Sequence, residues 1–213
     1  MKLFGASLSP YVRKVLAYAA EKGIELELVP GGMGQGGAEF EELSPFGKMP
    51  AFRDGDYGLC DSSAIIAYLE AKHPEPPLIP AEPKARGKTI WYDEFGDTIV
   101  MGAGAKIFFN RLVAPRILKI EGDMAAADAA ERNELPRIYD YLERAIPASG
   151  FLVEDRLTLA DLAVASPFAN LGHLALAVDP ARWPRTAAYV DAILARPSFA
   201  GWVERERKWI SKG

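Results

Sequence analysis

The chain has 213 residues, of which 49% are hydrophobic and 25% charged, and its formal net charge is -4 at pH 7. This length and composition are typical of a globular protein with one large domain or two small ones. The acidic balance argues against nucleic acid as the main partner, because nucleic-acid binding usually needs a basic surface. No apolar run approaches the roughly 20 residues of a membrane span, and no signal peptide opens the chain, so we expect no membrane contact and a cytoplasmic location.

The first thirty residues predict a strand, a helix and a second strand. Residues 2–4 and 24–29 favour strands, and the helix between them runs from Pro10 to Lys22 with apolar residues at helical spacing. Ser9 is the natural N-cap of this helix, and a proline at the first helical position costs nothing because its missing N–H has no helical partner there. Strand–helix–strand over about two dozen residues favours a βαβ unit with a parallel strand pair.

The glycine-rich residues 31–37 superficially resemble a phosphate-binding loop. No Gly-Lys-Ser/Thr follows them, and no helix opens at the spacing that such a loop needs. We therefore expect a flexible connection, followed by a short helix over residues 38–43.

Residues 47–66 predict a turn, a hairpin and a helix start. Pro50 marks the first position of a strand, and X-Pro is the common context for a cis peptide bond. The turn at residues 54–56 joins two short strands, and Asp61 or Ser62 then caps the next helix. Because a helix N-terminus carries partial positive charge, this stretch suits a ligand with a carboxylate.

The second half of the chain predicts helices only. Five prolines between residues 74 and 83 make a stiff connection, which is the best domain boundary. Helices are expected over residues 84–112, interrupted by glycines, and over residues 125–145, 187–194 and 199–209. Another helix starts at Thr158, where Asp161 three residues later predicts a capping box. The expected architecture is an α/β domain followed by an all-helical bundle.

Four motifs together resemble one known family. They are Ser9 to Val15, Pro45 to Pro50, Asp61 to Ile65, and Leu157 to Asp161. In this order and spacing, over the full length, the chain resembles a cytosolic glutathione S-transferase of the serine-type, phi- and theta-like bacterial branch. The resemblance implies a thioredoxin-like domain over residues 1–78, a linker over 79–85 and a helical domain over 86–213. It also implies a homodimer that binds glutathione.

The resemblance implies that Ser9 is the catalytic serine, with Ser7 as the rival hydroxyl. A hydroxyl at a helix N-terminus can donate a hydrogen bond to a bound thiolate, and helix N-termini lower the pKa of a thiol. Arg13, four residues after Ser9 as in that branch, is expected to add positive potential. The thiolate is the nucleophile, so such activation raises the reactive fraction near neutral pH.

The resemblance also assigns the glutathione contacts. Met49, before Pro50, resembles the residue whose backbone binds the cysteinyl part of glutathione. Ser62 resembles the anchor of the γ-glutamyl carboxylate, and Asp61 stands where the family usually has Glu or Gln. Lys48 resembles a lysine that pairs with the glycyl carboxylate.

The electrophile pocket is expected between the domains, on one face of the first long helix. Met101, Ala105, Phe108 and Leu112 form an apolar stripe on this helix, and Phe109, Tyr11 and Arg111 are expected to border the pocket. The same helical stripe also fits the core of a bundle. Phe46 matches a position where some classes insert an aromatic side chain into the partner subunit.

The expected function is conjugation of glutathione to a small hydrophobic electrophile. Peroxide reduction, β-elimination or isomerisation at the same site, or a non-catalytic binding module, are the alternatives. A disulfide-reductase function is not expected, because Cys60 is the single cysteine and lies in a predicted strand. His73 and His173 are far apart and flank no carboxylate motif, so no metal site is expected.

Overall fold

The computed structural model describes residues 1–212; Gly213, the last residue of the predicted helical domain, lies outside this range. A four-stranded sheet is formed by β1 (Lys2–Phe4), β2 (Glu27–Val29), β3 (Ala51–Asp54) and β4 (Tyr57–Cys60) in the order β2-β1-β3-β4. The β1–β2 pair is parallel, and the other two pairs are antiparallel. The parallel pair is the one that the strand–helix–strand pattern predicts.

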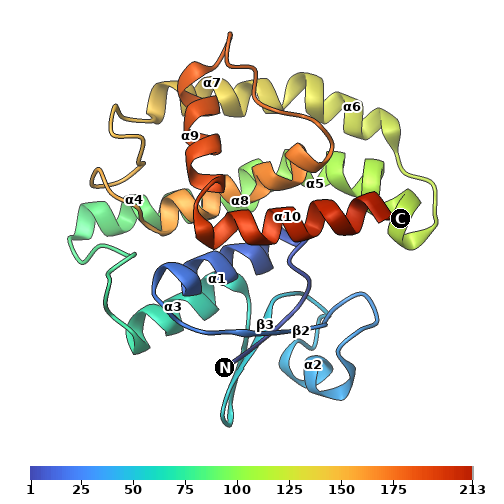
Figure 1. Ribbon diagram of the computed structural model, residues 1–213, viewed down its shortest axis with the longest axis vertical. Helices are drawn as coiled ribbons and strands as arrows, with labels where there is room; N and C mark the ends of the chain where they lie inside the picture. The colour runs from blue at the N-terminus through green and yellow to red at the C-terminus, as the bar shows by residue number, and fades with distance from the viewer. Residues whose placement is uncertain (213) are drawn as a thin grey trace.

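Three helices accompany the sheet: α1 (Pro10–Glu21), α2 (Gly37–Leu43) and α3 (Ser62–Lys72). Helix α1 connects the parallel strands, and α1 and α3 pack against each other, as Figure 1 shows. Strand β2 begins only at Glu27, later than the alternation of residues 24–29 predicts.

Within the described residues after α3, the regular elements are all helices, joined by loops, with one isolated bridge between Val153 and Arg156. The elements are α4 (Pro83–Glu94), η1 (Phe95–Val100), α5 (Met101–Phe108), η2 (Phe109–Leu118), α6 (Met124–Asn133), α7 (Leu135–Ala145), α8 (Leu159–His173), α9 (Pro184–Leu194) and α10 (Pro197–Lys212). The predicted fold class, a thioredoxin-like domain followed by a helical bundle, is confirmed. Figure 1 shows α10 lying beside α1, so the end of the chain returns to its beginning.

Two helical regions differ from their predicted extents. The first long helix does not stop near Leu112 but continues to Leu118, because η1 and η2 are π-helical segments that keep the backbone helical between and beyond the α-helical parts. The helix predicted over residues 125–145 is two helices that meet at Glu134. Pro136 lies in the first turn of α7 and has no N–H for the preceding turn, which favours a break there.

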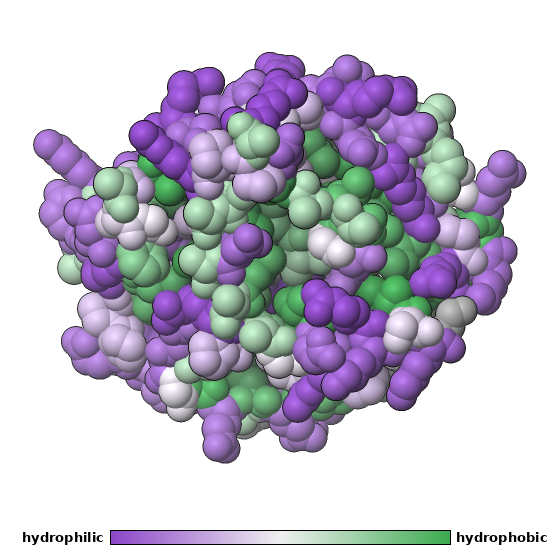
Figure 2. Space-filling view, turned by 45° about the horizontal axis from the view of Figure 1, so that its top comes forward, coloured by the Kyte–Doolittle hydropathy of each residue, from purple (hydrophilic) through white to green (hydrophobic). Residues whose placement is uncertain are grey.

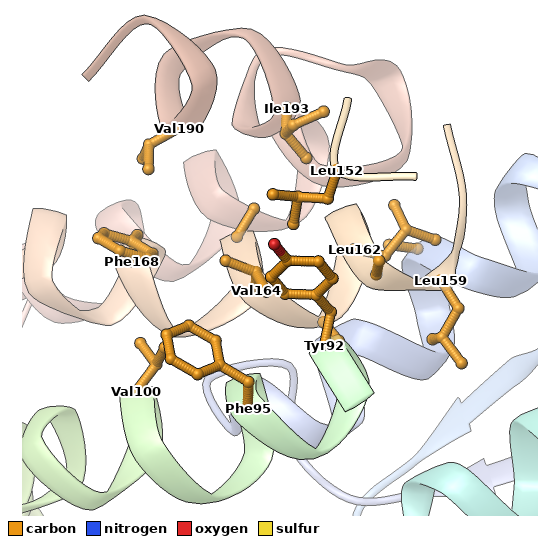
Figure 3. Packing of buried hydrophobic residues seen from close by; sticks show 14 of the residues in the cluster. Tyr92, Phe95, Val100, Leu152, Leu159, Leu162, Val164, Phe168, Val190 and Ile193 are labelled. Carbon is orange, nitrogen blue, oxygen red and sulfur yellow. The ribbon is translucent and has the colours of Figure 1, made fainter. Parts of the chain in front are cut away.

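Helix α8 is the central element of the helical part. Its start is held by Asp161, whose carboxylate accepts hydrogen bonds from the backbone N–H of Thr158 and of Leu152, both at 2.9 Å. Burial raises the pKa of Asp161 to about 6. The hydrogen bonds from Thr158 and Leu152 act in the opposite direction and lower it. Figure 3 shows the apolar side chains of α4, η1, α8 and α9 that meet around Tyr92 and Val164.

Gly96 is required where η1 crosses α8. A Cβ at this position would lie 2.6 Å from the carbonyl oxygen of Ala163, which is backbone and cannot turn away. We expect Gly96→Ala to lower the free energy of unfolding by about 2–3 kcal/mol through overpacking, measured by urea denaturation. Gly102→Ala is the matched control, because nothing lies within 4 Å of a Cβ there. The alanine should change stability by no more than about 1 kcal/mol, in the stabilising direction. Equal effects at the two positions would contradict the close contact.

Within residues 1–212, no helix has the length and apolar character that a membrane span requires. The face shown in Figure 2 has hydrophobic residues gathered near its centre with hydrophilic residues around them.

Candidate active site

A cavity of about 840 Å³ lies between the α/β part and the helical part. Its walls come from the loop before α1 and the first turn of α1, the glycine-rich segment, Met49, and the helices α5, η2, α8 and α10. The residues that line it are Ala6, Ser7, Leu8, Ser9, Pro10, Tyr11, Gly31, Gly32, Met33, Gln35, Met49, Met101, Gly104, Ala105, Phe108, Phe109, Val113, Ile117, Leu118, Pro167, Asn170, Trp202, Arg205, Glu206 and Trp209. Most of these side chains are apolar, so the cavity suits an apolar ligand.

Ser9 lies at the N-terminus of α1 and lines this cavity. It occupies the N-cap position with an extended backbone, yet its hydroxyl makes no capping hydrogen bond to the helix. A side chain that served only as a cap would accept from the N–H of the second or third helical residue. The Ser9 hydroxyl is therefore available to a ligand. Ser7 lines the same cavity, so the structure brings both rival hydroxyls to it.

The loop that carries Ser9 is held by side chains from α8. The Ser166 hydroxyl donates to the carbonyl of Pro10 at 2.8 Å, and the Asn170 amide donates to the carbonyl of Leu8 at 2.9 Å. These two bonds fix backbone on both sides of Ser9. Rigid support of this kind keeps a reacting group in one geometry.

Arg13 is buried and paired. Its guanidinium donates to the Glu206 carboxylate at 2.9 Å, to the Ser166 carbonyl at 3.2 Å and to the Asn170 side chain. Burial lowers the pKa of Arg13, and the Glu206 charge opposes this shift. Because the Glu206 carboxylate balances the charge of Arg13, Arg13 adds less positive potential at Ser9 than expected. The contacts of Arg13 join α1, α8 and α10.

The Met49–Pro50 and Asp61–Ser62 segments lie next to each other. The Met49–Pro50 peptide bond is cis, and the carbonyl of Pro50 accepts from the backbone N–H of Asp61 at 3.3 Å. Asp61 has a left-handed φ of 82°, and its carboxylate caps α3 by accepting from Ser63 and Ala64 N–H at 2.9 and 3.0 Å. Asp61 is thus the cap that the sequence left undecided between itself and Ser62.

A buried charge cluster adjoins Ser62, and the sequence did not reveal it. Lys14 donates to Asp93 at 2.7 Å and to Asp97 at 2.6 Å, and the Ser62 hydroxyl donates to Asp97 at 3.3 Å. Burial raises the pKa of Asp97, and Lys14 opposes that shift. Two carboxylates with one ammonium leave a net negative charge beside Ser62. No local signal could have placed Asp97 there, because it lies 35 residues from Ser62.

Residues 3–77 match the family model described as "Glutathione S-transferase, N-terminal domain", and residues 118–206 match "Glutathione S-transferase, C-terminal domain". A "Glutathione S-transferase" of Hyoscyamus muticus is 32% identical over 211 residues, which cover 96% of this chain and 98% of that protein. This chain belongs to the glutathione S-transferase family.

Two further relatives agree with this assignment. "Glutathione S-transferase 3" of Zea mays is 32% identical, with 93% of this chain and 91% of that protein covered. The crystal structure of a glutathione S-transferase from Methylobacterium radiotolerans, in complex with glutathione sulfonate, superposes with a TM-score of 0.76 at 30% identity. That match covers 95% of this chain and 93% of the other. The predicted family is confirmed.

In this family member, five residues assigned to the electrophile pocket line the cavity: Tyr11, Met101, Ala105, Phe108 and Phe109. The Tyr11 hydroxyl donates to the backbone carbonyl of Asp97 at 3.0 Å, and burial raises the pKa of Tyr11.

Arg111 and Leu112 do not line the cavity. Arg111 pairs with Asp128 at 2.7 Å and Glu131 at 2.5 Å on α6, and Leu112 is 2% exposed within the helical bundle. α-Helical periodicity continued past Phe109 predicts Arg111 and Leu112 on the cavity side, whereas the π-helical winding of η2 places both side chains away from the cavity. Within η2, Val113, Ile117 and Leu118 line the cavity instead.

Lys48 and Phe46 are exposed on the loop before β3. Phe46 is 88% exposed, an unusual state for a large aromatic side chain. Neither residue lines the cavity.

The α10 wall of the cavity was missed by sequence reasoning. Trp202, Arg205 and Trp209 line the cavity from this last helix. Their spacing of three and four residues marks one helical face, and two tryptophans on that face were the available signal.

Proposed function

We propose that this chain conjugates the thiolate of glutathione to small hydrophobic electrophiles, with Ser9 as the residue that stabilises the thiolate. One observation carries the proposal: a serine hydroxyl stands at a helix N-terminus, free of any capping bond, on the wall of a largely apolar cavity in a member of this family. The helix N-terminus and the hydroxyl both favour a negative sulfur there. Glutathione is the co-substrate, and the proposal needs no metal.

The glutathione peptide would lie along the α/β side of the cavity. The Met49 backbone, before the cis peptide bond to Pro50, would pair with the cysteinyl part, as an added strand pairs with a sheet edge. Ser62 would hold the γ-glutamyl carboxylate. The net negative cluster at Asp97, together with Asp61, would attract the γ-glutamyl ammonium group, and exposed Lys48 would reach the glycyl carboxylate.

The proposed conjugation balances in atoms and electrons. The thiol proton leaves to solvent, the sulfur lone pair forms a bond to an electrophilic carbon, and the leaving group departs with the electron pair of the broken bond. The chain contributes an oriented sulfur and an apolar space from which water is largely excluded. The apolar side chains of α5 and η2, Met101, Phe108 and Phe109 among them, would hold the electrophile.

Reductase chemistry through a protein thiol has little support. Cys60 is the single cysteine, it lies in β4, and it does not line the cavity. Membership of the transferase family favours conjugation over this alternative.

The direct test is turnover of chlorodinitrobenzene with glutathione, followed by absorbance and by mass spectrometry of the thioether. The wild type should form one thioether for each chloride released. Ser62→Ala should raise the KM for glutathione about tenfold, because it removes a hydrogen bond to a charged group, while the KM for the electrophile stays unchanged. If the wild type neither binds glutathione at millimolar concentration nor forms the thioether, a binding module becomes the better account.

We further propose a cytoplasmic homodimer. The 88% exposure of Phe46 supports a contact with a second copy, because such an aromatic side chain gains from burial in an interface. The domain division at residues 79–85 belongs to the same proposal. Residues 79–82 lie in the loop between α3 and α4, whereas residues 83–85 form the first turn of α4.

A further inference from the structure

Helix α10 presents one face to the cavity and the opposite face to another groove. Trp202, Arg205 and Trp209 lie on the cavity side. Glu204 and Arg207 line the groove on the other side of the helix, between α8 and α9. The helix is anchored by Glu206, which is buried and paired with Arg13. The cavity face of α10 is therefore held at a defined distance from the α1 N-terminus.

The charges on the cavity wall are few. Arg205 and Glu206 are the charged residues that line it in the part of the chain that the structure describes. The Glu206 charge is matched by Arg13 at 2.9 Å. Arg205 has no carboxylate within 4 Å among residues 1–212, because the neighbouring Glu204 pairs with Arg207 and Lys208, each at 3.3 Å. The wall thus carries one unmatched positive charge.

The position of this charge is set by an aromatic ring. The Arg205 guanidinium lies 4.9 Å from the centre of the Trp202 ring, in the geometry of a cation–π contact. Stacking leaves the edge of the guanidinium, with its N–H donors, free to bind. A guanidinium edge forms bidentate hydrogen bonds with a carboxylate. Beside it, the indole of Trp209 offers a flat apolar surface.

We propose that Arg205 is a specificity-determining residue that selects aromatic electrophiles carrying a carboxylate. The proposal rests on the conjugation proposed above and names the substrate class of the same site. The aromatic ring lies against the apolar wall, the carboxylate pairs with Arg205, and the reacting carbon faces the sulfur. In the probe reaction, the carbon–sulfur bond forms, the carbon–chlorine bond breaks, chloride leaves with the electron pair, and the thiol proton goes to solvent.

The test uses two electrophiles of equal size that differ in charge: chlorodinitrobenzoate and its carboxamide, chlorodinitrobenzamide. Arg205→Met keeps an apolar stem but removes the charge. It should raise the KM for the benzoate about tenfold, the loss expected when hydrogen bonds to a charged group are removed. The KM for the benzamide should stay within about twofold. Arg207→Met, on the opposite face of α10, is the matched control and should leave both KM values unchanged.

Three outcomes would overturn the inference. Equal losses with both electrophiles would make Arg205 a packing residue. A raised KM for glutathione with both electrophiles would assign Arg205 to a carboxylate of glutathione itself. Turnover of neither electrophile by the wild type would contradict the conjugation on which the inference rests, and this failure is distinguishable because the benzamide does not need Arg205.

Discussion

Replacement of Ser9 by alanine is expected to lower the kcat/KM for glutathione conjugation about 100-fold, the loss seen when one preorganised donor to a reacting anion is removed. This loss follows from the position of the Ser9 hydroxyl. The Ser9 hydroxyl stands at the N-terminus of α1, lines the cavity and makes no capping bond. Because the hydroxyl does not cap the helix, its removal should leave the free energy of unfolding nearly unchanged. The effect should therefore appear in the kinetics and not in stability.

Two matched variants sharpen this test. Ser9→Thr keeps a hydroxyl and should retain much of the activity. Ser7→Ala alters the rival hydroxyl in the same loop and should change kcat/KM by less than about threefold, which is the range of an incidental contact. A 100-fold loss in Ser7→Ala, with near-normal Ser9→Ala, would transfer the catalytic role to Ser7.

Arg13→Met is expected to lower the free energy of unfolding by about 3 kcal/mol, the lower end of the cost of breaking a buried ion pair, because the buried carboxylate of Glu206 then keeps only His173, whose Nε2 lies 2.8 Å away. Both side chains are almost fully buried, at 0% and 2% exposure. The substitution also removes donors to the Ser166 carbonyl and the Asn170 side chain. Urea denaturation measures the loss. At temperatures where the variant is folded, weaker anchoring of α10 should raise the KM for electrophiles.

The control is another ion pair between α1 and the start of α10. Arg196 binds Glu21 through two hydrogen bonds of 2.8 Å, but it is 33% exposed. Arg196→Met should cost about 1 kcal/mol, as partly exposed pairs do. The double variant Arg13→Met with Glu206→Leu should recover part of the loss, since it also removes the buried carboxylate that the single variant leaves without its guanidinium partner. If Arg13→Met costs no more than Arg196→Met, the buried pair does not anchor the helix.

The parts of the fold that were predictable from sequence depend on neighbouring residues. Ser9-Pro10 predicts the start of α1 because a proline suits the first helical position. The Thr158–Asp161 spacing predicts the start of α8 because a capping box acts within one turn. The break at Glu134 and the extension to Leu118 were missed. The π-helical winding of η2, a segment that contains Pro115, has no signal in the apolar periodicity.

The candidate site likewise contains some residues that local motifs predict and others that depend on distant parts of the chain. Ser9, Met49 and Ser62 each lie in a short local motif, so the resemblance could single them out. The Arg13–Glu206 pair joins residues 193 positions apart, and Lys14–Asp97 joins residues 83 apart. Neither pair has a sequence signature, since each depends on how α10 and η1 return to α1. Arg205 was missed although the spacing of Trp202 and Trp209 marks the helical face on which it lies.

The central claim is that Ser9 stabilises the thiolate of bound glutathione. It is tested most directly by the ultraviolet difference spectrum of bound glutathione against pH, in the wild type and in Ser9→Ala. In the wild type the thiolate band should appear near neutral pH, well below the ordinary thiol pKa of about 8.5. In Ser9→Ala it should appear only at higher pH, close to that ordinary value. Identical titrations in two proteins that both bind glutathione would contradict the claim and leave Ser9 without a role at the sulfur.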